Sequence, residues 1–234
     1  MPIKLSDLTS GILTHTNLGL VAVVHTGLSI GAAGVGSTLT DRAVVKDSSG
    51  RYIIPGSHLK GRLRHECEKL ARALGRTVCD SPRAEMMCPQ LGSEKQPQSG
   101  EALRAGITAE LGGMPCSICR LFGNPAQKAV LLFSDLLWDV EYPVDTIRNR
   151  VAINRRRRVA EDERLFFVET TPGGADLDFV GEVIAKRSLT DWEAKLLLAG
   201  LGQIDALGGS KSAGLGWLEI SCKDLSESTR STVE

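Results

Sequence analysis

The order in which strand-like and helix-like segments alternate constrains the fold of this chain more than any single motif. Apolar residues of one parity, with β-branched residues among the others, predict a strand over 16–30, and we expect further strands over 129–140, 165–170, 177–185 and 215–222. Apolar residues three and four positions apart predict a helix over 57–74, and a second over 190–207 opened by the capping box Thr190-x-x-Glu193. We expect Thr171-Pro172-Gly173-Gly174 to be the turn of a hairpin between the strands at 165–170 and 177–185.

This order predicts an α+β fold with a β-α-β-β-α-β core, the ferredoxin-like arrangement. The two helices would cover one face of an antiparallel sheet, leaving the other face open to a ligand or a neighbouring subunit. We expect one domain over 1–222 and a disordered polar tail over 223–234. Two segments lie outside the core pattern: an insertion over about 76–128 and an excursion over about 141–164.

The composition excludes several classes of protein. With 42% hydrophobic residues, the chain is neither disordered nor a coiled coil. Its 28 Lys and Arg balance 28 Asp and Glu, so any nucleic-acid binding must come from local patches. The stretch 8–40 lacks acidic and basic residues, but polar residues and glycines interrupt it, and no signal peptide is evident. We expect a cytoplasmic protein without a membrane association.

Four cysteines in the insertion have the spacing of metal ligands. Cys79 and Cys88 are followed, after twenty-seven residues, by the pair Cys116-x2-Cys119. Clustered cysteines in a reducing compartment are more often metal ligands than disulfides, which predicts a structural Zn²⁺ with these four thiolates. Ordinary reduced cysteines are the alternative, and His65 or Cys67 could replace one ligand.

The start of the first helix predicts an anion site. A Pro55-Gly56 turn precedes it, and Ser57 is placed to cap it. Unpaired amides at a helix N-terminus favour phosphate, and basic side chains reinforce that preference. A solvated basic helix face is the alternative. The candidate phosphate contacts in this segment are Ser57, His58, Lys60, Arg62 and Arg64.

A glycine-rich loop, 207–216, precedes the last strand and contributes three further candidates, Gly209, Lys211 and Ser212. Glycine lets backbone amides approach a polyanion closely, and Lys211 adds a positive charge. The loop is not a Walker motif, because no Gly-Lys-Ser/Thr opens a following helix. A tight helix-to-strand turn without a phosphate contact is the alternative.

Arginine is concentrated in the excursion, with seven arginines in the seventeen positions from Arg148 to Arg164. Arginine pairs bidentately with phosphate and stacks on bases, so this stretch favours a nucleic-acid contact over a solvated face. The candidate contacts are Arg155, Arg156, Arg157 and Arg158.

Three of these stretches together resemble one family, the RAMP proteins of CRISPR systems, and in particular the repeating backbone subunit of type III effector complexes. Residues 54–61, Ile-Pro-Gly-Ser-His-Leu-Lys-Gly, are similar to the family motif I-P-G-S-S-L-K-G. Residues 119–123, Cys-Arg-Leu-Phe-Gly, are similar to C-x-L-F-G, and 208–216 to the family's C-terminal glycine-rich loop. The three motifs occur in the family's order across almost the whole chain.

The resemblance implies an RRM-related subunit that polymerises along a CRISPR guide RNA and binds complementary target RNA. Its other partners would be copies of itself or related RAMP subunits, a large signature subunit and a small subunit. The arginine-rich excursion resembles the family's thumb, which wedges into the guide–target duplex. Asp41, in the stretch Asp41 to Asp47, matches the layout of the family's catalytic aspartate, which supports cleavage of target RNA with Mg²⁺ or another divalent cation. By itself, Asp41 would be read as a loop residue that caps a turn.

Three alternatives to a target-cleaving subunit stay open. Within the family, these are a scaffold subunit that does not cleave and an endoribonuclease that processes the guide. Outside it, a zinc-binding interaction protein without an RNA role would share the cysteine pattern.

Overall fold

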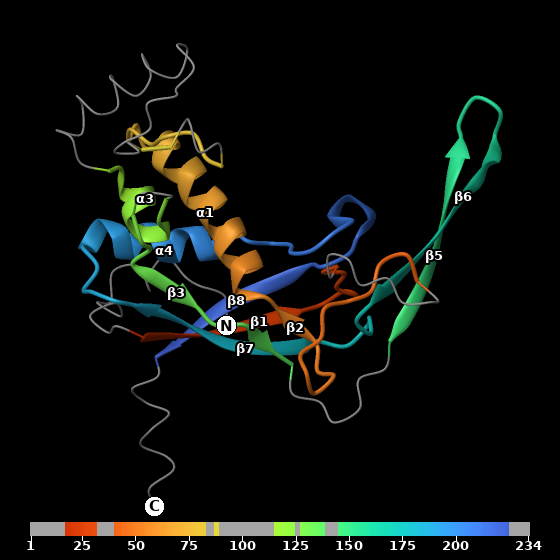
Figure 1. Cartoon of the computed structure of the whole chain (residues 1–234), viewed down its shortest axis with the longest axis horizontal. Coiled ribbons are helices and arrows are strands. Elements are labelled where there is room, and N and C mark those ends of the chain that lie inside the picture. The colour runs from red at the N-terminus through yellow and green to blue at the C-terminus, as the bar shows by residue number, and fades with distance from the viewer. Residues whose placement is uncertain are drawn as a thin grey trace, which may run out of the picture.

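An antiparallel sheet with helices on one face carries the fold (Figure 1). The computed structural model describes residues 17–31, 40–82, 87–88, 115–124, 127–138 and 145–224. Within these residues, the sheet contains β1 (Asn17–Val24), β2 (Ile53–Ile54), β3 (Leu131–Phe133), β4 (Leu136–Leu137), β7 (Leu177–Ala185) and β8 (Leu218–Asp224). The strand order is β2-β4-β7-β1-β8, and β3 also pairs with β7.

The strand order is that of a split β-α-β unit. Strand β7 lies between β1 and β4 and is antiparallel to both, so β1 and β4 run parallel and are joined through helix α1 (Gly56–Ala73). Helix α4 (Asp191–Gly202) connects β7 to β8, which pairs with the other edge of β1. The predicted α+β class with an antiparallel sheet is confirmed, and the topology is consistent with a ferredoxin-like arrangement.

The expected hairpin between 165–170 and 177–185 is wrong. Strand β6 (Val159–Thr170) pairs instead with β5 (Thr146–Asn154), and this pair projects away from the sheet (Figure 1). Both edges of β7 are already occupied, by β1 on one side and by β3 and β4 on the other. Within the predicted excursion over 141–164, residues 146–164 form β5, a turn and the first half of β6, and residues 141–144 lie outside the described residues.

The predicted strand over 129–140 is interrupted at Ser134 and Asp135, which separate β3 from β4. The Ser134 hydroxyl accepts the Glu182 N–H at 2.8 Å, and the Asp135 carboxylate accepts the Gly56 N–H at 2.7 Å. Asp135 therefore satisfies the first amide of α1, whose N-cap residue is Pro55 and not Ser57 as predicted.

Other boundaries shift by several residues. Strand β1 ends at Val24, where an extended strand to residue 30 was expected, and β8 occupies 218–224 in place of 215–222. Helix α4 ends at Gly202, five residues before the predicted end. Of the tail over 223–234, residues 223–224 belong to β8 and the remainder lies outside the described residues.

The two long helices pack closely on the sheet. Leu59, Leu63 and Cys67 form the buried stripe of α1. A Cβ at Gly200 of α4 would lie 2.6 Å from Cys67 Sγ, so only glycine permits this approach of the helices. Helix α3 (Ser117–Phe122) packs beside α1 (Figure 1). Within the described residues, no helix is both long and apolar enough to cross a membrane.

The capping box at the start of α4 forms as predicted and is linked to an ion pair whose carboxylate is buried. Thr190 Oγ1 accepts the Glu193 N–H, and the Glu193 carboxylate accepts the Thr190 N–H at 3.0 Å. Arg187 donates two hydrogen bonds to the same carboxylate, at 2.8 and 2.9 Å, and the Glu193 side chain is fully buried. Although burial opposes ionisation, the hydrogen bonds from Arg187 and Thr190 lower the pKa of Glu193 to about 2.

We expect the Glu193 carboxylate to give the stability of the protein an acid-sensitive component. An unfolded glutamate has a pKa of about 4.3, so the contribution is complete above about pH 5 and is lost as the pH falls toward 2. Glu193→Gln should lower the free energy of unfolding at pH 7 by on the order of 3 kcal/mol and flatten its dependence between pH 5 and 2. Urea unfolding across this range measures both effects.

Asp191→Asn is the matched control, because Asp191 lies in the same helical turn but is exposed and, among the described residues, forms an ion pair with Lys195 alone. It should change stability by less than about 0.5 kcal/mol. If the free energy of unfolding of Glu193→Gln and of the wild type depended on pH in the same way, Glu193 would not be the source of the acid-sensitive component.

Candidate functional site

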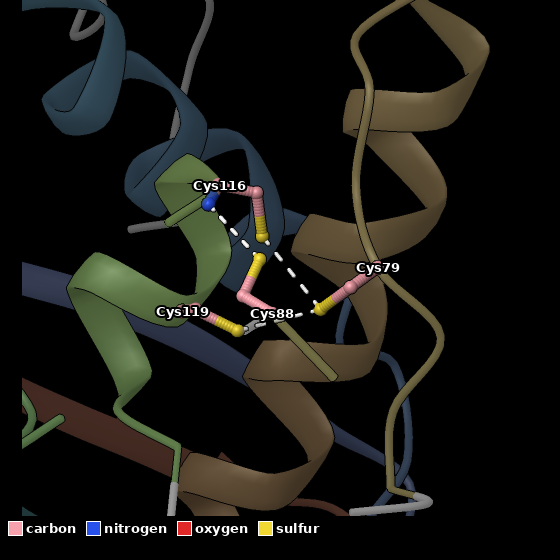
Figure 2. Close-up of side chains that lie close together, drawn as sticks. All are labelled: Cys79, Cys88, Cys116 and Cys119. Carbon is pink, nitrogen blue, oxygen red and sulfur yellow. Dashed lines mark hydrogen bonds between the residues drawn. The ribbon is translucent and has the colours of Figure 1, made fainter. Parts of the chain in front are cut away.

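The four predicted cysteines meet in one buried cluster (Figure 2). Cys79 Sγ lies 3.7 Å from Cys116 Sγ and 3.3 Å from Cys119 Sγ, and all four sulfurs lie within 4.8 Å of one another. Sulfur ligands of tetrahedral zinc lie about 3.8 Å apart, because each Zn–S bond is about 2.3 Å. The donor set and its spacing therefore fit a Zn²⁺ ion, and four protein ligands would make the site closed and structural.

Local structure explains how the cluster forms. Cys79 follows the end of α1, while Cys116 is the N-cap of α3 and Cys119 lies in its first turn. The Cys116 N–H donates to Cys88 Sγ at 3.1 Å. Neither alternative ligand joins the cluster. His65 is exposed, and Cys67 Sγ contacts the Leu196 carbonyl oxygen. Burial raises the pKa of the Cys67 thiol to about 12, as expected of an inert core cysteine.

The residues in the first turns of α1 that were predicted to contact RNA lie in different surroundings. Ser57 is exposed on the first turn. Burial, together with the positive charges of Arg64 and Lys186, lowers the pKa of the Lys60 ammonium group. Arg62 lies 3.0 Å from Glu66 and 3.8 Å from Asp205.

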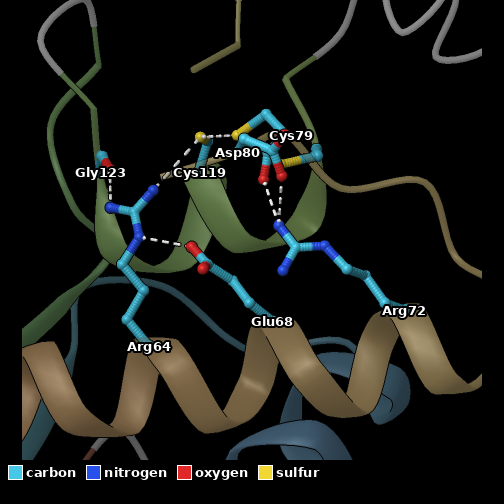
Figure 3. Close-up of polar contacts among 8 residues, drawn as sticks. Arg64, Glu68, Arg72, Cys79, Asp80, Cys119 and Gly123 are labelled. Atoms are coloured by element: carbon cyan, nitrogen blue, oxygen red, sulfur yellow. Dashed lines mark hydrogen bonds and ion pairs between the residues drawn. The ribbon is translucent and has the colours of Figure 1, made fainter. Parts of the chain in front are cut away.

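Arg64, predicted to contact RNA, instead directs its guanidinium group toward the cysteine cluster (Figure 3). Its side chain is 15% exposed and donates to acceptors within the fold. These contacts engage the Arg64 guanidinium group within the fold, and its predicted contact with RNA stays a prediction.

His58 connects the start of α1 to the glycine-rich loop. Its Nε2 accepts the Gly208 N–H at 3.2 Å, which requires this nitrogen to be unprotonated. Burial, and then the positive charge of Lys211, lower the pKa of His58 and favour that state. The residue that stands where the family motif has serine thus holds two of the predicted RNA-binding segments together.

The glycine-rich loop is fixed to the segment that follows β1. The Gly209 N–H donates to the Ser29 carbonyl oxygen at 2.7 Å, and the Gly216 N–H donates to that of Gly27 at 3.0 Å. Gly216 has φ of +72°, and a Cβ there would lie 1.9 Å from the Leu207 carbonyl oxygen, so no other residue fits. This anchoring leaves Lys211 and Ser212 exposed on a short 3₁₀ turn, Lys211–Ala213.

Hairpin β5–β6 carries arginines at both its tip and its base. Arg155 to Arg158 form the exposed turn at the tip. At the base, Arg150 Nη1 donates to Ser210 Oγ at 2.5 Å, and Arg148 Nε to Thr170 Oγ1 at 3.4 Å. The base of the hairpin therefore contacts the glycine-rich loop directly.

Asp41 lies beside the same hairpin. Its backbone N–H donates to the Phe167 carbonyl oxygen at 3.0 Å, and its Oδ2 accepts the Phe167 N–H at 2.8 Å. The side chain is exposed, and its second oxygen has no hydrogen-bond partner among the described residues. The neighbouring Arg42 extends toward the glycine-rich loop, with Nη1 4.0 Å from where a Cβ at Gly209 would lie.

Sequence reasoning missed the cations that this arrangement gathers. Arg42 and Arg150 join Lys211 around the loop, and Arg148 lies beside Gly27 and Gly173. None of these four cations has a carboxylate partner within the described residues. Arg148 and Arg150 were part of the arginine count, but only the fold gives them these neighbours. The result is a cationic surface without internal neutralisation, which suits a polyanion.

A polar network fixes the base of the hairpin to the segment that carries Asp41. Lys46 Nζ lies 2.5 Å from Asp145 Oδ1 and 3.5 Å from Glu169 Oε1, and the buried Tyr52 hydroxyl donates to Asp145. Burial, and then the nearby Asp145, raise the pKa of Glu169. Although burial opposes it, hydrogen bonds from Lys46 and Tyr52 lower the pKa of Asp145. The Asp145 carboxyl group is thus ionised more readily than that of Glu169.

The sequence matches the family model of the RAMP superfamily over residues 21–219. No curated protein shows a significant match. Among solved structures, a chain from an assembly titled "Type IV-B CRISPR Complex" is similar, with a TM-score of 0.56 and 17% sequence identity. The alignment covers 88% of this chain and 90% of that chain. At this identity the likeness shows a shared fold.

We expect about one zinc ion per purified chain by elemental analysis, because the cluster supplies four sulfur ligands. Cys119→Ser should lower zinc content and thermal stability together, since metal binding and folding are coupled at structural sites. Cys222→Ala, which leaves the cluster intact, should retain the metal. A folded wild-type protein that neither contains nor takes up zinc would rule out the site.

Proposed function

The chain belongs to the RAMP superfamily, and we propose that it is a backbone subunit of a type III CRISPR ribonucleoprotein that binds guide RNA and cleaves complementary target RNA. One observation supports this most: three segments distant in sequence meet at the glycine-rich loop. They are the Asp41–Arg42 segment, the start of α1 and the base of hairpin β5–β6. The likeness to a chain of a CRISPR assembly agrees with this setting.

The guide backbone would lie along the cationic surface formed by Arg42, Arg148, Arg150 and Lys211. Arginine forks pair bidentately with phosphate, and the absence of internal carboxylate partners within the described residues leaves these charges available. Sequence would be read by pairing between guide and target, with the protein contacting backbone and shape. The chain needs no net positive charge for this role.

Asp41 would act at the target strand. Its Oδ2 is held by the Phe167 N–H, which orients the carboxylate and leaves Oδ1 available for the reaction. Within the described residues, the cysteine cluster is the only group of three or more potential metal ligands, so Asp41 would share a divalent cation with RNA phosphates and water. Such an ion polarises the scissile phosphate. Asp41 itself would hold the ion or accept the proton of the attacking 2′-hydroxyl.

Asp41→Ala and Asp41→Asn should both abolish cleavage of labelled target RNA by the assembled, guide-loaded complex, while the complex still binds target. Asparagine retains an oxygen that can accept the Phe167 N–H, so it preserves the loop and removes only the charge. The wild type should cut at regular intervals, and only when Mg²⁺ is supplied.

If Asp41→Asn cleaves fully and Asp41→Ala does not cleave, Asp41 has only a structural role, as the acceptor of the Phe167 N–H. Target binding without cuts by any form, wild type included, would identify a scaffold subunit. Metal-independent cutting of a repeat hairpin by the isolated chain would identify a guide-processing enzyme.

Replacing Arg155, Arg156, Arg157 and Arg158 with alanine should weaken the binding of single-stranded RNA and flatten its salt dependence. Each lost phosphate contact reduces the slope of log K against log salt by about 0.7. Fluorescence anisotropy at several salt concentrations measures the slope. Lys69→Ala with Lys195→Ala is the control, because these lysines form ion pairs on the helices. Equal slopes for the arginine variant and the wild type would show that the tip does not contact RNA.

A further inference from the structure

Arg64 reaches from helix α1 to the cysteine cluster through its two Nη atoms, while its Nε is held by a residue of α1 itself (Figure 3). Nη2 lies 3.7 Å from Cys119 Sγ, and Nη1 donates to the Gly123 carbonyl oxygen at 2.8 Å. Nε donates to Glu68 at 3.0 Å, one helical turn further along α1. The guanidinium group therefore has a fixed orientation, with one edge facing a sulfur ligand.

That orientation addresses the main electrostatic difficulty of a four-cysteine metal centre. Four thiolates and one Zn²⁺ carry a net charge of −2, and burying charge without compensation is costly. A hydrogen bond from a cation to a ligating sulfur offsets part of this charge and fixes the direction of the ligand. Glu68 and Gly123 hold the donor in place, so the sulfur contact requires no further ordering of the side chain.

We propose that Arg64 is a positioning residue of the metal centre, which stabilises the Cys119 thiolate in its zinc-bound geometry and anchors that geometry to α1. The proposal concerns zinc retention and does not depend on the RNA function. It assigns to Arg64 a role that a lysine cannot fill, because one ammonium group does not present the planar fork that reaches three separate acceptors.

Arg72, two turns further along α1, provides an internal comparison. Its Nη2 donates to the Cys79 carbonyl oxygen and to Asp80 Oδ1, both at 2.9 Å (Figure 3). Arg72 thus holds the other half of the cluster through its backbone, and none of its hydrogen bonds within the described residues reaches a sulfur. Its side chain is 43% exposed, compared with 15% for Arg64. Both arginines bind the insertion to α1, but only Arg64 contacts a ligand atom.

The test compares Arg64→Gln, Arg64→Lys and Arg72→Gln in the full-length, zinc-loaded protein. Transfer of zinc to a coloured chelator gives the release rate, and replacement of zinc by Co²⁺ gives a sulfur-to-metal charge-transfer band. Changes in such supporting residues typically alter metal affinity by about 10- to 100-fold. We expect zinc release from Arg64→Gln to be at least about tenfold faster than from the wild type.

The charge-transfer band separates a ligand contact from general loosening of the insertion. Loss of a hydrogen bond to sulfur raises the energy of its lone pairs, so the band should move to longer wavelength in both Arg64 variants. It should stay in place in Arg72→Gln, whose zinc release should remain within about threefold of the wild type. If Arg64→Gln does not fold, Arg64→Lys, which retains the positive charge, is compared with Arg72→Gln and the wild type instead.

Two results would overturn the proposal. One is an unshifted band with wild-type zinc release in the folded Arg64 variants. The other is that Arg72→Gln changes the zinc release rate and the band position as much as Arg64→Gln does. The two arginines would then have the same role in holding the cysteine segments to α1.

Discussion

The antiparallel pairing of β7 with strands on both its edges organises the rest of the structure. Ala22 of β1 lies opposite Phe179 on one side, and Leu137 of β4 lies opposite Val180 on the other. Because both edges of β7 are filled, β6 does not pair with it, and hairpin β5–β6 extends from the body of the molecule (Figure 1). The same pairing places β1 between β7 and β8, so the segment after β1 meets the glycine-rich loop before β8.

The connection from β6 to β7 then fixes the base of the hairpin beside that loop. Thr171 exchanges hydrogen bonds with Leu28, through its backbone N–H at 3.0 Å and its Oγ1 at 2.9 Å. The network of Lys46, Asp145 and Glu169 holds both strands of the hairpin to the segment after Asp41. Arginines, glycine-rich loop and Asp41 are thus parts of one connected structure, in which a movement of the hairpin would displace the carboxylate as well.

The cysteine cluster has a different relation to this surface. It lies against the middle and end of α1, whereas the glycine-rich loop meets the first turn of the same helix through His58. Helix α1 therefore connects a cysteine cluster that could hold a metal ion with the cationic surface at the glycine-rich loop. Its two arginines near the cysteines, Arg64 and Arg72, have partners within the fold.

Sequence alone determined the features that depend on local pattern and on spacing. Both long helices follow from the periodicity of their apolar residues. The capping box follows from Thr190 and Glu193, and the cysteine cluster from the Cys116-x2-Cys119 half-site preceded by Cys79 and Cys88. Only the tertiary structure decided the partner of β6, the hydrogen bond from the first amide of α1 to Asp135, the direction of Arg64, and the approach of Arg42 and Arg150 to one loop. An alternating pattern specifies that a segment is a strand, but it does not say which edge remains available. A charged side chain takes its role from partners that lie far away in the sequence, and these become neighbours only when the sheet has formed.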